Sequence, residues 1–222
     1  MKIAPEGYPF IIGSLLITVI VLIVFVISWK PGNPNLSSIL LFVGCFFLSC
    51  ITCFMFYFFR DPDRIIPEGK NIFVSPADGK IILIRDVFES GHLKTDTKQI
   101  SIFMSPFNVH VNRAPCDGRV LTVQHTPGLF LAAYKEDAPI RNENIAMVLE
   151  GGLGKVLVRQ VAGFIARRAV CRVTPGEHLL RGERYGMIKF SSRLDVYLPK
   201  DTKIRIKAGD KVLAGETVLG EL

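Results

Sequence analysis

Two long stretches without a charged side chain stand at the start of the chain and limit what it can fold into. Phe10 to Ile27 is a run of 18 such residues, and Leu36 to Phe59 is a run of 24. Each run is long enough to cross the hydrocarbon core of a bilayer as a helix. Neither has a polar face, so a soluble helical hairpin would expose apolar side chains to water. We therefore expect a membrane hairpin over residues 1–62, with spans at about 10–27 and 36–59.

A cleaved signal peptide is the main alternative for the first run. The second run follows after only eight residues, "SWKPGNPN", and this favours a hairpin. Lys2 precedes the first run, Lys30 lies alone between the runs, and Arg60, Arg64 and Lys70 follow the second. Because loops rich in lysine and arginine stay in the cytoplasm, we expect an inner-membrane protein with its C-terminal domain on the cytoplasmic side.

The net charge lies almost entirely in the part after the hairpin. Residues 60–222 contain 25 basic and 19 acidic side chains, a net charge of +6. A basic domain beside a membrane attracts anionic lipid by about 1 kcal/mol for each well-placed basic residue. Nucleic acid is the usual alternative partner for a basic domain. The sequence has no motif of interleaved aromatic and basic residues, so we expect anionic membrane lipid and no nucleic acid.

The five cysteines do not form the pattern of a disulfide framework. Cys45, Cys50 and Cys53 lie inside the second apolar run, and Cys116 and Cys171 are isolated. The Cys50-x2-Cys53 spacing has no further ligands near it, so we expect no metal site. Cysteines without disulfides fit a reducing, cytoplasmic location.

The remaining 160 residues, 63–222, are predicted to form one mostly β domain. Short segments rich in valine and isoleucine recur between turn signals such as "ADG", "CDG" and "AGD". These segments are "IFVSP", "GKIILIRDVF", "KQISIFMSP", "NVHVNRAP", "GRVLTVQH", "NIAMVLEG", "GKVLVRQVAG", "ARRAVCRV", "GMIKF", "RLDVYLP", "TKIRIKAG" and "ETVLGEL". A helix over "PGLFLAAYK" is only weakly indicated.

The C-terminal segment "DTKIRIKAGDKVLAGETVLGEL" resembles the hammerhead turn of biotinyl and lipoyl carrier domains. The resemblance implies a barrel-sandwich-hybrid-like fold for the domain. Lys80 follows the "ADG" turn, which is where a carrier domain could place its modified lysine. A carrier function would leave the membrane hairpin and the paired serines of "KFSSRLDVYLP" unexplained, so we do not favour it.

Three polar residues in apolar surroundings are candidates for chemistry: Asp78 in "SPADGK", His110 in "NVHVNR" and Ser192 in "KFSSRLD". Each has an ordinary structural explanation when it is considered alone, as a turn aspartate, a buried strand histidine and a strand serine. Together they could form a relay in which the aspartate orients an imidazole that removes a hydroxyl proton. Any protein of this size contains all three residue types, so composition alone does not establish the relay.

Several separated motifs resemble those of the phosphatidylserine decarboxylase family in its short proenzyme form. They are "FFRDPDR", "VSPADGKI", "IFMSPFNVHVNRAP", "KFSSRLDVYLP" and "AGDKVLAGETVLGEL", which follow one another from about Phe58 to Leu222. The N-terminal apolar hairpin is also typical of that form.

The resemblance implies a chain that makes its own cofactor. Ser192 matches the serine that becomes a pyruvoyl group, after its hydroxyl attacks the carbonyl of Ser191 and the chain is cut between them. His110 matches the base of the family and Asp78 matches the aspartate that pairs with it. The ketone would then form a Schiff base with phosphatidylserine, and the product would be phosphatidylethanolamine. The partners so implied are the lipid substrate and the two product chains of 191 and 31 residues; a homo-oligomer is left open.

The chain departs from the family pattern at Ser191, where the family usually has glycine. Glycine bends towards the attacking hydroxyl without steric cost, so Ser191 could slow the cut or be the nucleophile itself. A non-processing lipid-binding homologue and the same chemistry on another serine-headed lipid, such as archaetidylserine, stay open. Arg113 in "VNRAP" is a weaker candidate for contact with the lipid phosphate or carboxylate, and a surface salt bridge is its alternative.

Overall fold

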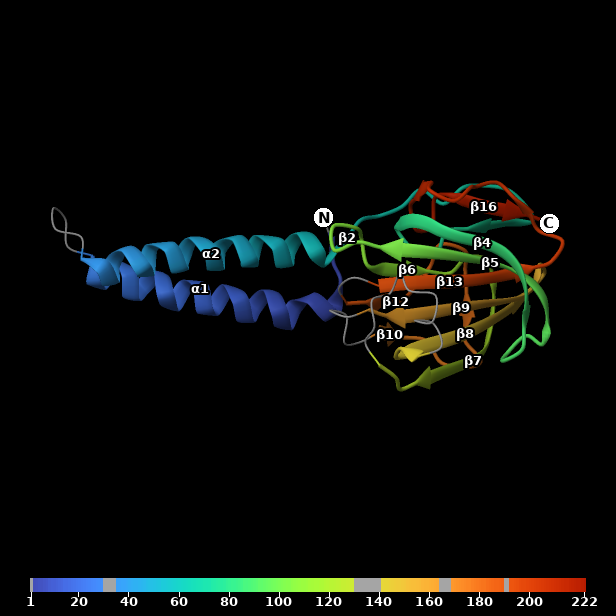
Figure 1. Ribbon diagram of the computed structural model, residues 1–222, viewed down its shortest axis with the longest axis horizontal. Coiled ribbons are helices and arrows are strands. Elements are labelled where there is room, and N and C mark those ends of the chain that lie inside the picture. The colour runs from blue at the N-terminus through green and yellow to red at the C-terminus, as the bar shows by residue number, and fades with distance from the viewer. Residues whose placement is uncertain (1, 30–34, 130–140, 164–168, 190–191) are drawn as a thin grey trace. The chain divides into compact units, whose positions relative to one another are not determined.

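The computed structural model of the chain describes residues 2–29, 35–129, 141–163, 169–189 and 192–222. The chain divides into two compact units, Met1–Pro62 and Asp63–Leu222. In the described residues the first unit contains two long helices, α1 and α2, and the second is built from strands (Figure 1). The expectation of a mostly β protein with two apolar helices at its N-terminus is therefore confirmed.

The first unit pairs two helices that are long and apolar enough to cross a membrane. Helix α1 spans Tyr8–Ser28 after a single 3-10 turn, Pro5–Gly7, and α2 spans Leu36–Phe58. The side chain of Asn35 caps α2 by accepting a hydrogen bond from the Ser38 amide at 2.9 Å, which satisfies one of the unpaired donors of a helix start. Two short strands, β1 (Lys2–Ile3) and β2 (Arg60–Asp61), join the ends of the unit in antiparallel pairing.

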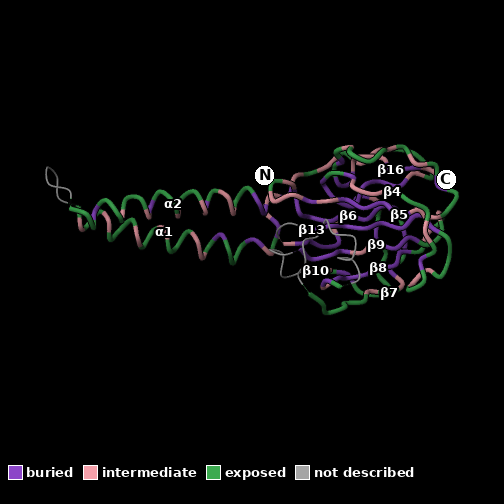
Figure 2. The backbone as a smooth tube through the Cα atoms, in the orientation of Figure 1, coloured by how far each residue is buried: buried purple, intermediate pink, exposed green. Residues whose placement is uncertain are grey.

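The two helices pack against each other along their length. The Oγ1 atoms of Thr18 and Thr52 lie 3.1 Å apart, and the rings of Phe25 and Phe42 have centroids 5.8 Å apart. Small hydroxyl residues at a helix contact allow close approach and hydrogen bonding between apolar helices. The remaining apolar side chains are mostly exposed, and Figure 2 shows both helices largely in the colour of exposed residues.

The second unit contains one large curled sheet and two small ones. Its strands are β3 (Ile72–Val74), β4 (Gly79–Glu89), β5 (Thr95–Met104), β6 (Val111–Arg113), β7 (Gly118–Thr126), β8 (Asn144–Gly151), β9 (Gly154–Ala162), β10 (Ala169–Cys171), β11 (His178–Leu179), β12 (Arg184–Ile188), β13 (Ser192–Pro199), β14 (Lys203–Ile204), β15 (Lys211–Val212) and β16 (Val218–Glu221). The large sheet has the order β11-β7-β8-β9-β13-β5-β4-β15, and the small sheets have the orders β10-β12-β6 and β14-β16-β3. Each of the twelve strand-like segments of the sequence coincides with one of these strands.

Strand β13 lies inside the large sheet, with β5 on one side and β9 on the other (Figure 1). Successive side chains of a strand point to opposite faces, so Leu194, Val196 and Leu198 enter the main hydrophobic core, together with Ile100 and Ile102 of β5. The odd-numbered residues of β13 face the other side of the sheet.

The C-terminal segment returns along the sheet as its sequence indicates. Gly209 has a φ of +98°, a backbone conformation that favours glycine, and its amide donates to the carbonyl of Ile81 at 2.8 Å. Strand β15 then pairs with β4, and β16 pairs with both β14 and β3. The weakly indicated helix over residues 127–135 lies mostly outside the described residues.

Candidate active site

Ser192 is the first residue of β13 and lies at one end of the large sheet. In the two antiparallel registers it faces Met104, the last residue of β5, and Ala162, the last residue of β9. Its side chain is fully buried, and its hydroxyl donates to the Sδ of Met104 at 3.4 Å. Because a thioether is a weak acceptor, this contact positions the hydroxyl without engaging its oxygen lone pairs.

A chain of buried amide groups lies behind this contact. Asn112 of β6 donates to the same Met104 sulfur at 3.9 Å, and its Oδ1 accepts a hydrogen bond from Gln160 Nε2 at 2.8 Å. Gln160 also donates to the carbonyl of Val170 at 3.3 Å. Buried hydrogen bonds of this kind hold the side chains that they join in place. The network therefore links Met104, the partner of Ser192, to strands β6, β9 and β10.

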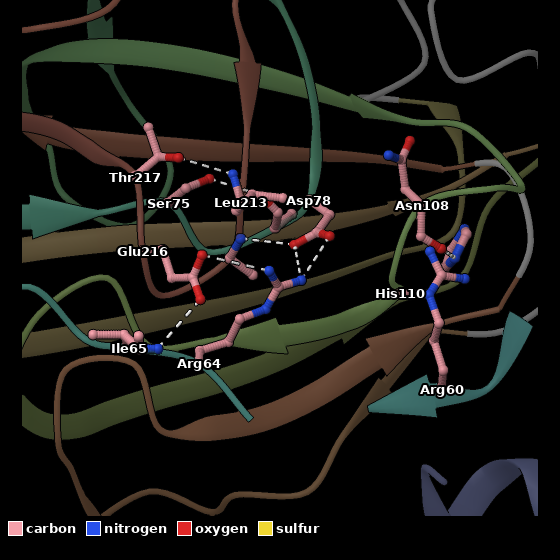
Figure 3. A network of polar contacts seen from close by, with 12 residues as sticks. Arg60, Arg64, Ile65, Ser75, Asp78, Asn108, His110, Leu213, Glu216 and Thr217 are labelled. Atoms are coloured by element: carbon pink, nitrogen blue, oxygen red, sulfur yellow. Dashed lines mark hydrogen bonds and ion pairs between the residues drawn. The ribbon is translucent and has the colours of Figure 1, made fainter. Parts of the chain in front are cut away.

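His110 lies in the connection between β5 and β6 and is fully buried. Its Nδ1 is 3.0 Å from the carbonyl oxygen of Asn108, as Figure 3 shows. A carbonyl can only accept, so Nδ1 carries the proton and Nε2 is the basic nitrogen of the neutral ring. The carbonyl of His110 accepts a hydrogen bond from the amide of Ile188 at 3.2 Å. This bond attaches His110 to the chain four residues before Ser192.

Asp78 immediately precedes β4 and is buried, with 4% of its surface exposed. Its two carboxylate oxygens accept hydrogen bonds from Nη2 of Arg64 at 2.9 and 2.8 Å, and the amide of Ala214 donates to Oδ1 at 2.8 Å (Figure 3). Arg64 also lies 3.6 Å from a carboxylate oxygen of Glu216. Asp78 thus takes part in a buried ion pair that fixes its carboxylate, and its pairing with His110 stays a prediction.

The sheet order brings the three candidate residues to the same end of the large sheet. Strands β13, β5 and β4 are neighbours, and Ser192 starts β13, His110 follows β5 and Asp78 precedes β4. Antiparallel neighbours run in opposite directions, so the start of β13, the end of β5 and the start of β4 lie at the same end of the sheet. The three positions are therefore at one end, although 114 residues separate Asp78 from Ser192.

Neither cysteine of this unit is an activated nucleophile, and its described residues form no metal cluster. Burial raises the pKa of the Cys116 thiol to about 12, with Asp117 adding to the effect, and burial also raises the pKa of Cys171. Both are therefore neutral thiols at physiological pH, whereas a reactive cysteine is a thiolate. Within the described ranges no three His, Cys, Asp or Glu side chains are grouped to hold a metal ion.

Comparison with known proteins assigns the chain to a family. The family profile described as phosphatidylserine decarboxylase matches residues 51–220. The chain belongs to the phosphatidylserine decarboxylase family. Relatives named phosphatidylserine decarboxylase proenzyme occur in Geotalea uraniireducens (48% identical over 221 residues), Geotalea daltonii (47%) and Syntrophus aciditrophicus (43% over 219 residues). The matches cover 98–99% of this chain and 96% of each relative.

The structure adds partners to the candidate site residues that the sequence did not reveal. Arg64 holds Asp78, Met104 accepts the hydroxyl of Ser192, and Asn108 orients the ring of His110. Arg64 and Met104 could not have been chosen from the sequence, because neither has a distinctive spacing from its partner. Asn108 could have been suspected, since asparagine in a loop often bonds to nearby backbone, and its side chain accepts from the amide of Ser105 at 2.9 Å.

A buried ion pair follows directly after Ser192 on the other face of β13. Nε of Arg193 donates to Oδ1 of Asp195 at 2.7 Å, and its Nη2 donates to the hydroxyl of Ser101 on β5 at 2.8 Å. The two charged side chains are 4% and 0% exposed. Because alternate residues of a strand share one face, the sequence "SRLD" already places Arg193 and Asp195 on the same face, and their ion pair could have been predicted from it. This ion pair fixes the first residues of the strand that Ser192 begins.

Replacing Asp195 with alanine should destabilise the full-length protein by about 3–5 kcal/mol, because it leaves the buried guanidinium of Arg193 without its carboxylate. Asp96→Ala is the matched control. It removes an exposed ion pair to Lys200, 2.9 Å long, and should cost less than about 1 kcal/mol. Unfolding of both variants in detergent, followed by circular dichroism, measures the difference. Equal losses of stability would contradict a structural role for the buried pair.

Arg113 and Ser191 are the remaining site residues that the sequence suggested. Arg113 is not a surface residue: it is 5% exposed and donates from Nη1 to the carbonyl of Gly182 at 2.9 Å. The expected surface location is therefore wrong for this residue, and its contact with substrate stays a prediction. Ser191 lies outside the described residues, so the backbone before Ser192 is not described.

Proposed function

We propose that the chain is a precursor that cuts itself between Ser191 and Ser192. The resulting enzyme decarboxylates phosphatidylserine to phosphatidylethanolamine with a pyruvoyl group formed from Ser192. The observation that carries the proposal is the position of Ser192, fully buried at the start of β13 and at the sheet end where Asp78 and His110 also lie. Full-length relatives named as proenzymes of this decarboxylase support it.

In the cutting step His110 is the base. Its Nε2 takes the proton of the Ser192 hydroxyl while the oxygen attacks the carbonyl carbon of Ser191. The peptide bond between the two residues breaks, and an ester to Oγ replaces it. Loss of the α-hydrogen of residue 192 then breaks the Cβ–Oγ bond and releases a chain that ends in the Ser191 carboxylate. Water displaces the remaining nitrogen as ammonia, which leaves a ketone at the start of the 31-residue fragment.

The residues around position 192 fit such a group. When present, a pyruvoyl ketone takes up the electron pair left on the α-carbon of the amino acid as carbon dioxide departs. Burial at the end of β13 keeps bulk water away from this position. Strands β5 and β9 hold the residue from both sides, and His110 can return a proton to the α-carbon. Asp78 supplies the negative charge that we propose stabilises the protonated imidazole.

The fragment that begins at residue 192 would stay bound after the cut. It contains β13, β14, β15 and β16. Strand β13 is hydrogen-bonded on both edges, β15 pairs with β4, and β16 pairs with β3. The strand pairing thus retains the short chain and its new N-terminal group without a covalent link.

We place the enzyme in the inner membrane with the strand unit on the cytoplasmic side. Support comes from the two apolar helices and from Arg60, Arg64 and Lys70, which follow the second helix. The net charge of +6 after the hairpin suits an anionic lipid substrate.

Release of carbon dioxide from phosphatidylserine in neutral detergent micelles tests the proposed reaction. The purified protein should release it, and treatment with hydroxylamine or borohydride, which react with ketones, should abolish the release. If the protein is cut but releases carbon dioxide only from another serine-headed lipid, that lipid is the substrate and phosphatidylserine is not. A protein that stays uncut and inactive would instead support a lipid-binding homologue.

Changing Ser191 to glycine should give a precursor that cuts itself at least as fast as the parent. Glycine reaches conformations with positive φ that cost a serine free energy, so the carbonyl before Ser192 is presented more easily. The time course of fragment appearance on a gel, after cell-free synthesis, measures the rate. Ser90→Gly, in the β4–β5 turn, is the control and should leave the rate unchanged. Slower cutting in the Ser191 variant would contradict the steric argument.

A further inference from the structure

Two lysines face each other across paired strands close to the end of the sheet that carries Ser192. Lys80 of β4 is directly opposite Lys211 of β15 on one side and Phe103 of β5 on the other. Residues that face each other in antiparallel strands share one face of the sheet, and like charges in this position are destabilising. A pair of ammonium groups kept at such a position therefore indicates a ligand that carries negative charge.

Neither lysine has an ion-pair partner among the described residues, although other strand lysines do. Lys98 of β5 pairs with Asp86 at 2.8 Å and Lys155 of β9 with Glu150 at 3.7 Å. The nearest acidic residues in sequence make other contacts: Asp78, two positions before Lys80, binds Arg64, and Asp210, next to Lys211, accepts a hydrogen bond from the amide of Lys207 at 2.9 Å. Both lysine side chains are exposed and can meet a ligand from solution or from a lipid surface.

The two lysines line a cavity of about 380 Å³. Its other lining residues are Gly79, Phe103, Ser105, Asn108, Val212 and Leu213. The cavity therefore joins a basic side to an apolar side, with a hydroxyl and an amide between them. Asn108 is also the residue whose carbonyl orients His110, and Figure 3 shows Asn108 beside His110 and Leu213 near Asp78.

The cavity lies within reach of the reacting position. Phe103, opposite Lys80, is also opposite Arg193 of β13, so these side chains lie on the sheet face opposite that of the Ser192 side chain. The cavity approaches residue 192 at the end of the sheet, where its lining residue Asn108 contacts His110. Two interstrand spacings separate β4 from β13, which is roughly 10 Å between backbones, and a lysine side chain bridges much of that distance. In a serine phospholipid only two carbons and one oxygen separate the amine from the phosphorus. A lipid whose amine reaches residue 192 would thus place its phosphodiester near these lysines.

We propose that Lys80 and Lys211 bind the phosphodiester of the lipid substrate, with Phe103 and Leu213 in contact with its glycerol and acyl carbons. This inference rests on the proposed function and names the substrate-binding part of the same site. A phospholipid fits better than free phosphate because the apolar side chains of Phe103, Val212 and Leu213 line the cavity together with the lysines. Leu213 is 44% exposed, and Phe107, on the loop that carries Ser105 and Asn108, is 67% exposed.

The test compares Lys80→Gln/Lys211→Gln with Lys155→Gln/Lys203→Gln in the full chain. The control removes the same charge from exposed lysines outside the cavity, so general attraction to anionic lipid is matched. For phosphatidylserine in neutral detergent micelles, the cavity variant should raise KM about tenfold, as loss of charge-assisted bonds predicts. Its kcat and self-cleavage should stay close to those of the parent. The control should leave KM unchanged.

Two further measurements distinguish the sources of the effect. Deacylated glycerophosphoserine should show the same rise in KM, and inorganic phosphate should inhibit the parent more strongly than the cavity variant. A rise in KM that is absent with glycerophosphoserine would contradict a phosphodiester site and assign the lysines to the membrane surface. The charge-preserving variant Lys80→Arg/Lys211→Arg should restore most of the affinity, and no restoration would also contradict the proposal.

Stability gives an independent readout. Because the facing lysines repel each other, the Gln variant should unfold at a temperature no lower than the control variant does, and a lower temperature would contradict the argument. If the parent is active and the Lys80→Gln/Lys211→Gln variant has the same KM as the parent, this inference is overturned and the proposed function is not. A parent that releases no carbon dioxide from phosphatidylserine would overturn the proposed function.

Discussion

Replacing Ser192 with alanine should leave a single uncut chain of 222 residues that releases no carbon dioxide from phosphatidylserine. The variant removes the only atom, Oγ, that can form the ester with the carbonyl of residue 191. It also removes the source of the ketone, so cutting and decarboxylation are lost together. The fold should survive, because the hydroxyl makes only a weak bond to Met104 Sδ at 3.4 Å. Intact-mass analysis and a carbon dioxide assay on the purified protein measure the two losses.

Ser75→Ala is the matched control for this variant. Ser75 is also a fully buried serine, and its hydroxyl donates to the carbonyl of Ala77 at 2.7 Å. Its replacement should cost about 1 kcal/mol of stability and leave cutting intact. If the Ser192 variant still yields two fragments, with the new cut after Phe190, then Ser191 is the nucleophile and our assignment of the cleavage site is wrong.

Replacing His110 with glutamine should slow self-cleavage by about 10²–10⁴-fold, the usual contribution of a positioned general base. The imidazole is held by its Nδ1–H bond to Asn108, which leaves Nε2 as the base. Glutamine is polar and places its amide near the position of Nε2, but the amide cannot accept the serine proton. The rate at which the precursor band disappears after synthesis, compared with the parent, measures the effect.

His178→Gln is the control for the histidine variant, because His178 is exposed on β11 and we assign it no role. It should cut at the parental rate. The same comparison with His125→Gln tests a second histidine, which lies 3.3 Å from Glu143. Parental cutting by the His110 variant, or slow cutting by either control, would contradict the assignment of the base.

The sequence predicted the strands and helices well because each depends on local pattern. The uncharged runs became α1 and α2, and the alternating segments became strands, since burial on one face of a sheet requires that alternation. It also singled out Asp78, His110 and Ser192, although the strength of that choice came from family resemblance. That these positions share one end of the sheet follows from the order β13-β5-β4, which no local pattern reveals.

The partners of the site residues could not be predicted, because they depend on strand register and on the paths of loops. The structure joins Asp78 in an ion pair to Arg64, in the segment after the second helix, which no sequence pattern indicated. The pairing of Asp78 with His110, which the family resemblance implies, stays a prediction. Lys80 faces Lys211 because of the register between β4 and β15, and the two lysines are 131 residues apart in the sequence. A shift of one residue in that register would separate the two lysines onto different faces.

Intact-mass analysis of the purified parent protein tests the central claim most directly. The account predicts a 31-residue fragment, residues 192–222, lighter by one ammonia than the peptide that begins with Ser192. Borohydride should add two hydrogen atoms to this fragment and to no other. An intact chain of 222 residues, or a fragment with an unmodified serine at its start, would contradict the claim that Ser192 becomes the reactive ketone.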